Sequence, residues 1–227
     1  MIHLLTQLAL YGDVIPLKLK LDYKKFEEGL KKYNNKWVQY NPRKNIPRYG
    51  LSITSLDGGF SGIPDLDSLK EYNEKHNLNL DEPDIKTLTP FWPYVESVLS
   101  KFKNHLGRTH LIKKSAGGQF PSHRDGYERE VNSFRLFLPI YNCNPPFNYF
   151  ILDDKILRFE HGRLYFINTL KEHIVITSAR GGPPSGGPDN TKNFIPGGGD
   201  LQSMYIVANI NLNEESIDLV LHNMQSS

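Results

Sequence analysis

The second half of the chain consists of short apolar runs separated by turn residues, and this pattern limits the possible folds more than any other feature of the sequence. From about Arg108 onward, strand-favouring residues alternate with clusters of Gly, Pro, Asn and Asp. Short strands with no long helix between them favour an antiparallel sandwich or barrel. The expected strands are Thr109–Lys114, Ser133–Tyr141, Phe147–Ile151, Arg163–Asn168, His173–Ser178 and Ser203–Ile210.

The first hundred residues carry helical patterns instead. Residues 23–33 place Phe26 and Leu30 on one face, and Asp22 stands where an N-cap is expected. The other expected elements of this part are a strand over 47–58, a helix over 67–76 and a helix over 94–106.

The length of 227 residues suits a single domain, 1–227. Residues 1–107 would then support a β core over 108–212. Residues 181–199 are rich in Gly and Pro and show no periodicity. A loop of this length inside a compact domain is usually functional or disordered. We expect it to be a lid over the functional site, and the alternative is an insertion without a role.

Charge, hydropathy and cysteine content exclude several classes of protein. The formal net charge of +2 gives no reason to expect a nucleic-acid partner. No apolar run approaches the ~20 residues that span a bilayer, and the N-terminus lacks the basic region of a signal peptide. The single cysteine, Cys143, rules out an internal disulfide and favours a reducing compartment, so we expect a cytoplasmic protein. The oligomeric state stays open.

One stretch carries the residues expected for metal chemistry. In Phe120-Pro-Ser-His-Arg-Asp-Gly126, the residues His123 and Asp125 are two apart, so an extended backbone points both side chains to one side. His173 follows fifty residues later, at the start of another expected strand. Two histidines and one carboxylate form the facial triad of non-haem Fe(II) oxygenases, which leaves coordination positions open for other ligands. The alternative is a surface histidine next to a turn aspartate. The remaining histidines have no carboxylate at ligand spacing and are expected to be structural or solvated.

The stretch 120–179 resembles the aspartyl/asparaginyl β-hydroxylase-like branch of the 2-oxoglutarate oxygenases, which includes proline cis-4-hydroxylases. The shared pattern is His-x-Asp at 123–125, Arg-x-x-Leu-Pro as Arg135-Leu-Phe-Leu-Pro139, a Gly-led aromatic strand from Gly162 to Phe166, and the distal His173. The resemblance covers about half of the chain. It implies a double-stranded β-helix (a jelly-roll, cupin-like fold) with helices in the N-terminal part, which agrees with the strand pattern.

The resemblance also implies an activity. Fe(II), 2-oxoglutarate and O₂ would hydroxylate an amino acid, free or peptide-bound, and give succinate and CO₂. Halogenating relatives lack the carboxylate of the triad, so the presence of Asp125 favours hydroxylation. Arg135 would bind the 2-oxoglutarate carboxylate near the metal, and its alternative is a strand-end Arg paired with Glu128 or Glu130.

The chain departs from the family pattern at the other end of 2-oxoglutarate. The family places an Arg about ten residues past the distal histidine, where this chain has the 181–199 segment. Arg180 and Lys113 are the candidates to replace it. Arg124, Tyr127 and Arg48 are candidates for reading the polar groups of the substrate, and each is equally explained as a surface residue.

Two other functions remain open at this stage. A non-catalytic jelly-roll or cupin module that binds a sugar or a peptide would make His123 and Asp125 incidental. A different metal enzyme on the same fold is the third possibility, since cupins also hold two or three histidines. The fold alone does not separate the three.

Overall fold

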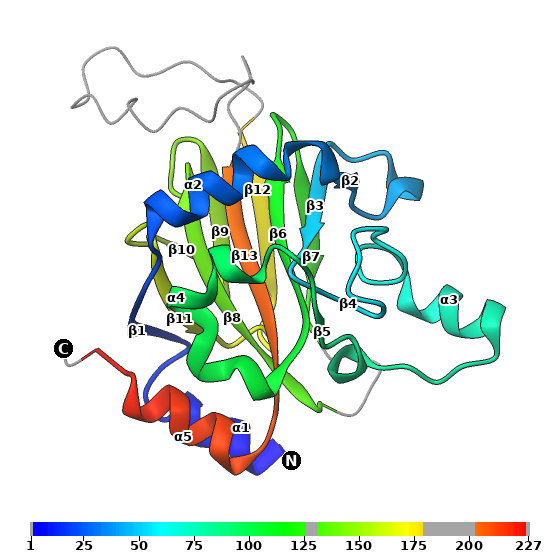
Figure 1. The fold of residues 1–227 in the computed structure, drawn as a ribbon. Coiled ribbons are helices and arrows are strands. Elements are labelled where there is room, and N and C mark those ends of the chain that lie inside the picture. Colours follow the sequence, from blue (N-terminus) through cyan, green and yellow to red (C-terminus); the bar gives the residue numbers. More distant parts are fainter. Residues whose placement is uncertain (1, 126–130, 179–202, 226–227) are drawn as a thin grey trace.

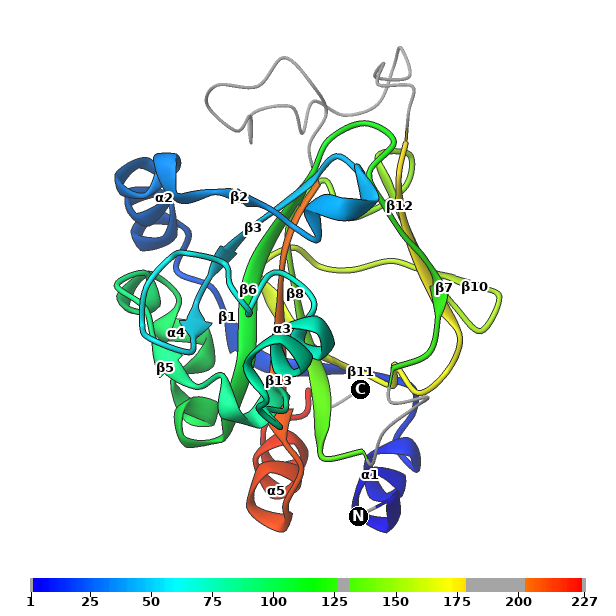
Figure 2. The ribbon, with the colours of Figure 1, turned by 90° about the vertical axis from the view of Figure 1, so that its right-hand side faces the viewer.

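The computed structural model describes residues 2–125, 131–178 and 203–225, and its main feature is two β-sheets that face each other (Figures 1 and 2). The large sheet has seven strands in the order β1-β11-β8-β13-β6-β3-β2, and the small sheet has four in the order β10-β9-β12-β7. A separate pair joins β4 to β5. The strands are β1 Val14–Lys20, β2 Val38–Gln39, β3 Arg48–Ser52, β4 Thr54–Ser55, β5 Thr87–Leu88, β6 Leu106–Lys114, β7 Gln119–His123, β8 Ser133–Tyr141, β9 Asn148–Leu152, β10 Lys155–Leu157, β11 Arg163–Ile167, β12 His173–Thr177 and β13 Ser203–Asn211.

The pairing of the eight strands from β6 to β13 is that of a jelly-roll. The first pairs with the last (β6 with β13), the second with the seventh (β7 with β12), the third with the sixth (β8 with β11) and the fourth with the fifth (β9 with β10), all antiparallel. The chain therefore alternates between the two sheets, as in a double-stranded β-helix. The fold class expected from the sequence is confirmed, and β1, β3 and β2 extend the large sheet with residues from before 107.

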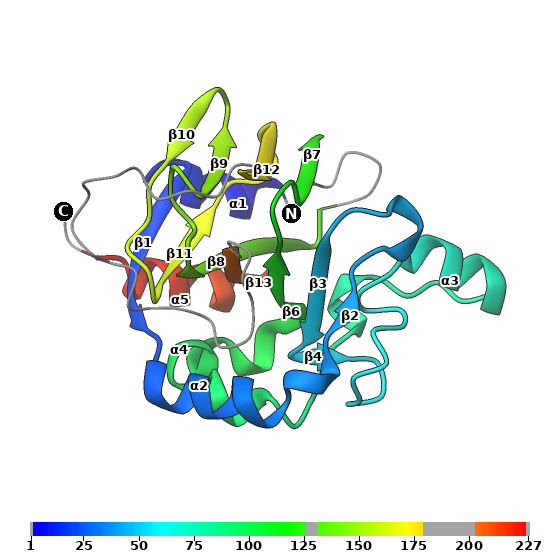
Figure 3. The same cartoon turned by 90° about the horizontal axis from the view of Figure 1, so that it is seen from above.

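Helices cover the outer face of the large sheet and one end of the molecule. Figure 3 shows α2 and α4 on the side of the large sheet that faces away from the small sheet, and Figure 1 shows α1 and α5 side by side at one end. The α-helices are α1 Ile2–Ala9, α2 Tyr23–Lys32, α3 Leu69–His76, α4 Glu96–Leu99 and α5 Glu214–His222. Short 3₁₀ segments are Asn34–Lys36, Pro42–Lys44, Glu82–Asp84, Trp92–Tyr94 and Ser100–His105. No helix among the described residues is both long and apolar enough to cross a membrane.

The large sheet is buried on both faces. Leu111 belongs to the apolar cluster between this sheet and the helices, whereas its neighbour Ile112 belongs to the cluster between the two sheets. Successive strand residues point to opposite faces, so β6 directs Arg108, His110 and Ile112 into the space between the sheets.

Several expected elements agree with the structure and one does not. Helix α2 begins at Tyr23, and the Asp22 side chain accepts a hydrogen bond from the Lys25 amide, as expected of an N-cap. The helix expected over 94–106 is wrong, because this stretch contains only the short α4 between two 3₁₀ segments. Its apolar residues are nevertheless buried, since a spacing of three residues keeps one face inward in a 3₁₀ turn as well; they are Val95, Val98, Leu99 and Phe102. The expected lid, 181–199, lies outside the described residues.

Candidate metal centre

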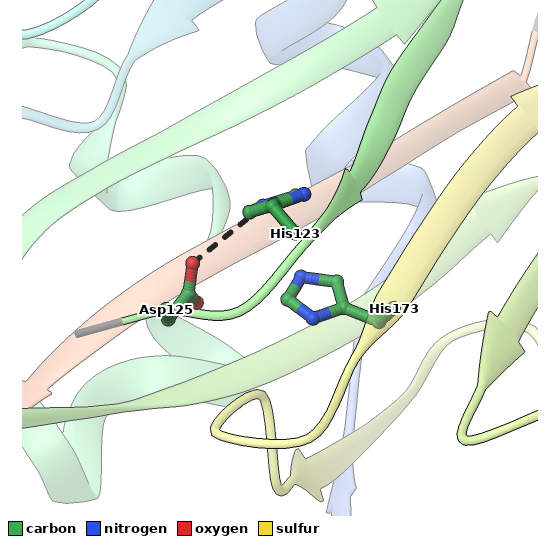
Figure 4. Close-up of side chains that lie close together, drawn as sticks. All are labelled: His123, Asp125 and His173. Carbon is green, nitrogen blue, oxygen red and sulfur yellow. Dashed lines mark ion pairs between the residues drawn. The ribbon is translucent and has the colours of Figure 1, made fainter. Parts of the chain in front are cut away.

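The small sheet brings the two histidines of the sequence motif together. His123 is the last residue of β7 and His173 is the first residue of β12, and the two are direct partners in the antiparallel register. Asp125 follows β7 immediately, and its amide donates a hydrogen bond to the Thr169 carbonyl at 2.9 Å. Figure 4 shows the three side chains pointing toward one another from these two strands. Residues fifty positions apart in sequence therefore converge at one point.

The ligand atoms of the three residues are close enough to share one ion. One nitrogen of each histidine and one oxygen of Asp125 all lie within 4.8 Å of one another. His123 Nε2 is 3.6 Å from Asp125 Oδ1, and the two imidazole ring centres are 4.2 Å apart. Ligand atoms about 2.0–2.2 Å from one first-row metal ion lie roughly 3 Å apart on an octahedral face, so the three side chains would draw together when an ion binds.

Backbone hydrogen bonds orient both imidazoles in the same way. His123 Nδ1 lies 2.6 Å from the Pro121 carbonyl oxygen, and His173 Nδ1 lies 3.0 Å from the Lys171 carbonyl oxygen. A carbonyl oxygen only accepts, so each Nδ1 carries a proton, which leaves Nε2 as the nitrogen that can bind a metal. This is the usual outer hydrogen bond that fixes the tautomer of a metal-binding histidine. Burial lowers the pKa of His173, which favours the neutral form that a metal requires.

The carboxylate is held by an ion-pair chain that the sequence did not reveal. Arg135 Nε lies 3.0 Å from Asp125 Oδ2, and Arg135 Nη2 lies 2.8 Å from Glu82 Oε2. Asp125 thus directs one oxygen to the arginine and the other toward His123. Burial alone would raise the pKa of Asp125, but the Arg135 guanidinium and then the His173 imidazole outweigh it and lower that pKa. The result is an ionised carboxylate with a fixed orientation.

The donor set fits a divalent first-row metal ion. Two neutral imidazoles and one carboxylate are borderline ligands of the kind that bind Fe(II), Mn(II), Co(II) or Zn(II). All three residues lie on one side of the point where their ligand atoms converge, and a cavity of about 270 Å³ opens beside them between the two sheets. His123, Asp125 and His173 all line this cavity. The open side can therefore admit a small molecule to the remaining coordination positions.

The cavity contains polar atoms without partners near the triad and apolar side chains farther in. His110 Nδ1 and Asn209 Oδ1 are buried, and neither has a hydrogen-bond partner among the described residues. Deeper in, the wall is formed by Phe137, Phe150 and Tyr205. A ligand of this cavity would meet hydrogen-bonding groups at the triad end and aromatic rings beyond them.

The other expected site residues fall into three groups: those at the cavity, those away from it, and those outside the described residues. Arg135 lines the cavity and contacts the triad. Lys113 does not line it, because alternation along β6 turns its ammonium to the opposite face, 4.4 Å from the centre of the Trp37 ring. Arg124 is exposed and Arg48 is buried, and neither is among the residues that line the cavity. Tyr127, Arg180 and both acidic residues proposed as alternative partners of Arg135 lie outside the described residues.

Sequence reasoning missed two charged residues. Glu82 comes from a 3₁₀ segment and sits between Arg135 and Arg108, whose Nη1 is 3.6 Å from Glu82 Oε1. No motif links it to the triad. Lys114, the neighbour of Lys113, is fully buried between the two sheets, where its ammonium donates to Asn148, and it is not among the residues that line the cavity. Its side could not be read from the sequence, since both faces of this strand carry apolar residues.

No family model matches the chain, and no curated protein matches it. Similar solved structures include a prolyl-4-hydroxylase from Pseudomonas putida, with 9% identity, a TM-score of 0.46 and coverage of 94% of this chain and 100% of that chain. A 2OG-Fe(II) oxygenase family oxidoreductase from Burkholderia pseudomallei has 9% identity, a TM-score of 0.41 and coverage of 73% and 67%. A cupin domain from Bordetella pertussis has 13% identity, a TM-score of 0.30 and coverage of 47% and 82%. At TM-scores below 0.5, these likenesses do not identify the chemistry of this chain.

Proposed function

We propose that this protein is an Fe(II)- and 2-oxoglutarate-dependent oxygenase that hydroxylates an amino acid, free or peptide-bound. The observation that carries the proposal is the convergence of His123, Asp125 and His173 beside an internal cavity. When bound there, Fe(II) together with 2-oxoglutarate and O₂ supplies an oxidant strong enough for an unactivated C–H bond, with succinate and CO₂ as co-products.

Each residue of the site has a distinct role in this proposal. His123 and His173 present their Nε2 atoms to the metal, because their Nδ1 protons are donated to backbone carbonyls. Arg135 keeps Asp125 ionised and turned toward the histidines. The aromatic part of the cavity excludes water around the reacting groups. Arg135 also adds a positive charge beside the triad, where a carboxylate of the co-substrate would lie.

Turnover of 2-oxoglutarate without added substrate tests the proposal. We expect the protein with Fe(II) and O₂ to convert 2-oxoglutarate slowly to succinate, and we expect a chelator to stop the reaction. His123→Ala and His173→Ala should lose both metal binding and succinate formation. His222→Ala is the matched control, since this histidine is exposed on α5, and it should behave like the wild type.

The outcomes separate the competing functions. Tight metal binding without any consumption of 2-oxoglutarate would point to a cupin-like binding module or to another metal enzyme. Absence of metal binding in the wild type would remove the triad as a functional site. Succinate formation that survives in both histidine variants would contradict the assignment of the ligands.

A further inference from the structure

A carboxylate from outside the large sheet connects three neighbouring strands beside the candidate metal centre. Glu82 belongs to a 3₁₀ segment, and its Oε2 lies 2.8 Å from Arg135 Nη2 on β8. The same oxygen accepts a hydrogen bond from Asn209 Nδ2 on β13 at 2.6 Å, and Oε1 lies 3.6 Å from Arg108 Nη1 on β6. Strands β8, β13 and β6 are consecutive in the sheet, so this one side chain bridges all three.

The guanidinium of Arg135 is divided between two acids along a single edge. Nε and Nη2 carry the two parallel N–H bonds of that edge, and such a fork usually binds both oxygens of one carboxylate. Here Nε lies 3.0 Å from Asp125 Oδ2, whereas Nη2 is directed to Glu82. Asp125 therefore gives only one oxygen to the arginine, and its Oδ1 lies 3.6 Å from His123 Nε2, on the side of the triad.

The division of this fork matters for metal binding. Without an acid at position 82, the same edge of Arg135 is expected to turn fully to Asp125 and bind both of its oxygens. An oxygen bound in this way competes with a metal ion for the same lone pairs. When Asp125 instead ligates an ion, part of its charge is withdrawn from Arg135, and Glu82 remains to compensate the guanidinium.

Glu82 is itself held from the side away from Asp125. Arg108 is fixed by two backbone carbonyls, because its Nε donates to that of Asp65 at 2.7 Å and its Nη2 donates to that of Asp67 at 3.0 Å. Its Nη1 is thereby directed to Glu82. The position of the Glu82 carboxylate is thus set by strands of the large sheet, and Arg135 adapts to two acids whose places are fixed from different parts of the chain.

A glycine on β6 lets the backbone of the Glu82 segment lie close to the sheet. A Cβ at Gly107 would lie 2.7 Å from the Glu82 carbonyl oxygen, closer than real side chains approach such an atom, and 3.1 Å from Pro83 Cα. Both neighbours are backbone atoms, so only a movement of the whole segment would relieve the overlap. The absence of a side chain at Gly107 therefore determines how near Glu82 comes to Arg135.

We propose that Glu82 is a positioning residue of the metal centre: it divides the Arg135 fork so that Asp125 keeps one oxygen for the metal, and Gly107 sets the distance at which it does so. This inference rests on the metal site of the proposed function, but it does not involve 2-oxoglutarate. Glu82 acts through Arg135 and supplies no ligand atom.

The affinity for Mn(II), measured by calorimetry in a double-mutant cycle, tests the proposal. Glu82→Gln keeps the size of the side chain and removes its charge, and we expect it to weaken Mn(II) binding about tenfold, within the range for hydrogen bonds to charged groups. In an Arg135→Met background there is no fork to divide, so the same substitution should have no effect. Glu28→Gln, on the exposed face of α2, is the matched control and should bind like the wild type.

The cycle separates the fork from a general effect of charge. A negative charge that simply attracts the cation would still matter after Arg135 is replaced, so an equal loss in both backgrounds would overturn the proposal. Wild-type affinity in Glu82→Gln would overturn it as well, while leaving the proposed function intact. A wild-type protein that binds no Mn(II) would contradict the proposed function and this inference together.

A second variant moves Glu82 without changing any charge. Gly107→Ala should displace the 3₁₀ segment and weaken Mn(II) binding in the same direction as Glu82→Gln, with no further loss when the two are combined. Gly29→Ala is the matched control, because it also places a Cβ where there is no room, but on the outer face of the large sheet. Urea unfolding reports whether each variant is folded. An equal loss of affinity in Gly29→Ala would mean that lower stability, rather than the position of Glu82, weakens the site, and would overturn the role of Gly107.

Discussion

Lys113 and Lys114 are adjacent residues whose ammonium groups have opposite surroundings. Lys113 rests against the rings of Trp37 and Tyr49 on the outer face of the large sheet. Lys114 reaches across the space between the sheets to Asn148. Burial lowers the pKa of Lys114 to about 7; the nearby Cys143 thiol opposes this change and Arg48 adds to it. A lysine in this range can gain or lose its proton near neutral pH.

The pH dependence of stability follows from this pKa. The folded protein binds the Lys114 proton more weakly than the unfolded chain does, because an unperturbed lysine has a pKa of about 10.4. We expect the contribution of Lys114 to the free energy of unfolding to decrease as the pH falls from about 10 to about 7. Urea unfolding of the wild type and of Lys114→Met between about pH 7 and 9 measures this change.

The other groups around Lys114 do not titrate in this interval. Burial raises the pKa of Cys143 to about 12 and that of Tyr205 well above its usual value, and Arg48 stays charged because the pKa of a guanidinium lies far above pH 9 even when burial lowers it. Lys114→Met should therefore lose the rise in stability between about pH 7 and 9. An equal rise in the variant would mean that another group causes it.

Helix α2 depends on one glycine for its approach to the neighbouring 3₁₀ segment. Gly29 is buried in the helix, and a Cβ at this position would overlap the near end of the Tyr94 ring. We expect Gly29→Ala to lower the free energy of unfolding by about 1–2 kcal/mol, since the overlap costs more than the improved helix propensity contributes. Urea unfolding measures the change. Glu28→Ala, at the exposed neighbouring position, should stay within about 0.5 kcal/mol of the wild type, and a stabilised Gly29→Ala would disprove the close approach.

The elements that the sequence predicted well are those whose residues agree locally with the final fold. Strand β8 occupies the whole of the expected Ser133–Tyr141, and β13 begins at the expected Ser203. Strand β1 was missed because Pro16 interrupts its pattern, and proline is tolerated there since β1 lies at the edge of the sheet. Helix α5 was also missed, although Asn213 and Ser216 form a capping box that marks its start.

The site was predictable where one rule of strand geometry sufficed. Alternation on β7 put His123 and Asp125 on one side, and His173 followed from its place at the start of a strand. Glu82 was not predictable, because it approaches Arg135 from a part of the chain that has no regular pattern. The outward direction of Lys113 was not predictable either, since burial on both faces of β6 removes the usual contrast between an apolar and a polar side.

A metal ion bound at the triad would stabilise the edge strand of the small sheet and so the whole molecule. Strand β7 is the outermost strand of that sheet, and most of its side chains are exposed. A metal bound to His123 and His173 would cross-link it to β12. We expect Mn(II) at 100 times its Kd to raise the free energy of unfolding by about 2.7 kcal/mol, and hydrogen exchange to slow most in residues 119–123. His173→Ala should lose both effects, and a similar gain in that variant would place the metal elsewhere.

The position of β13 determines when this protein can become functional during its synthesis. This strand is the last in sequence, yet it lies between β6 and β8 in the large sheet. A nascent chain that ends before Ser203 holds β6 with β3 on one side and β8 with β11 on the other, with nothing to join them. His123, Asp125 and His173 leave the ribosome earlier, but the two sheets that frame them cannot close until residues 203–211 are free to insert. We therefore expect the candidate metal centre to form only after residues 203–211 have left the ribosome and inserted between β6 and β8.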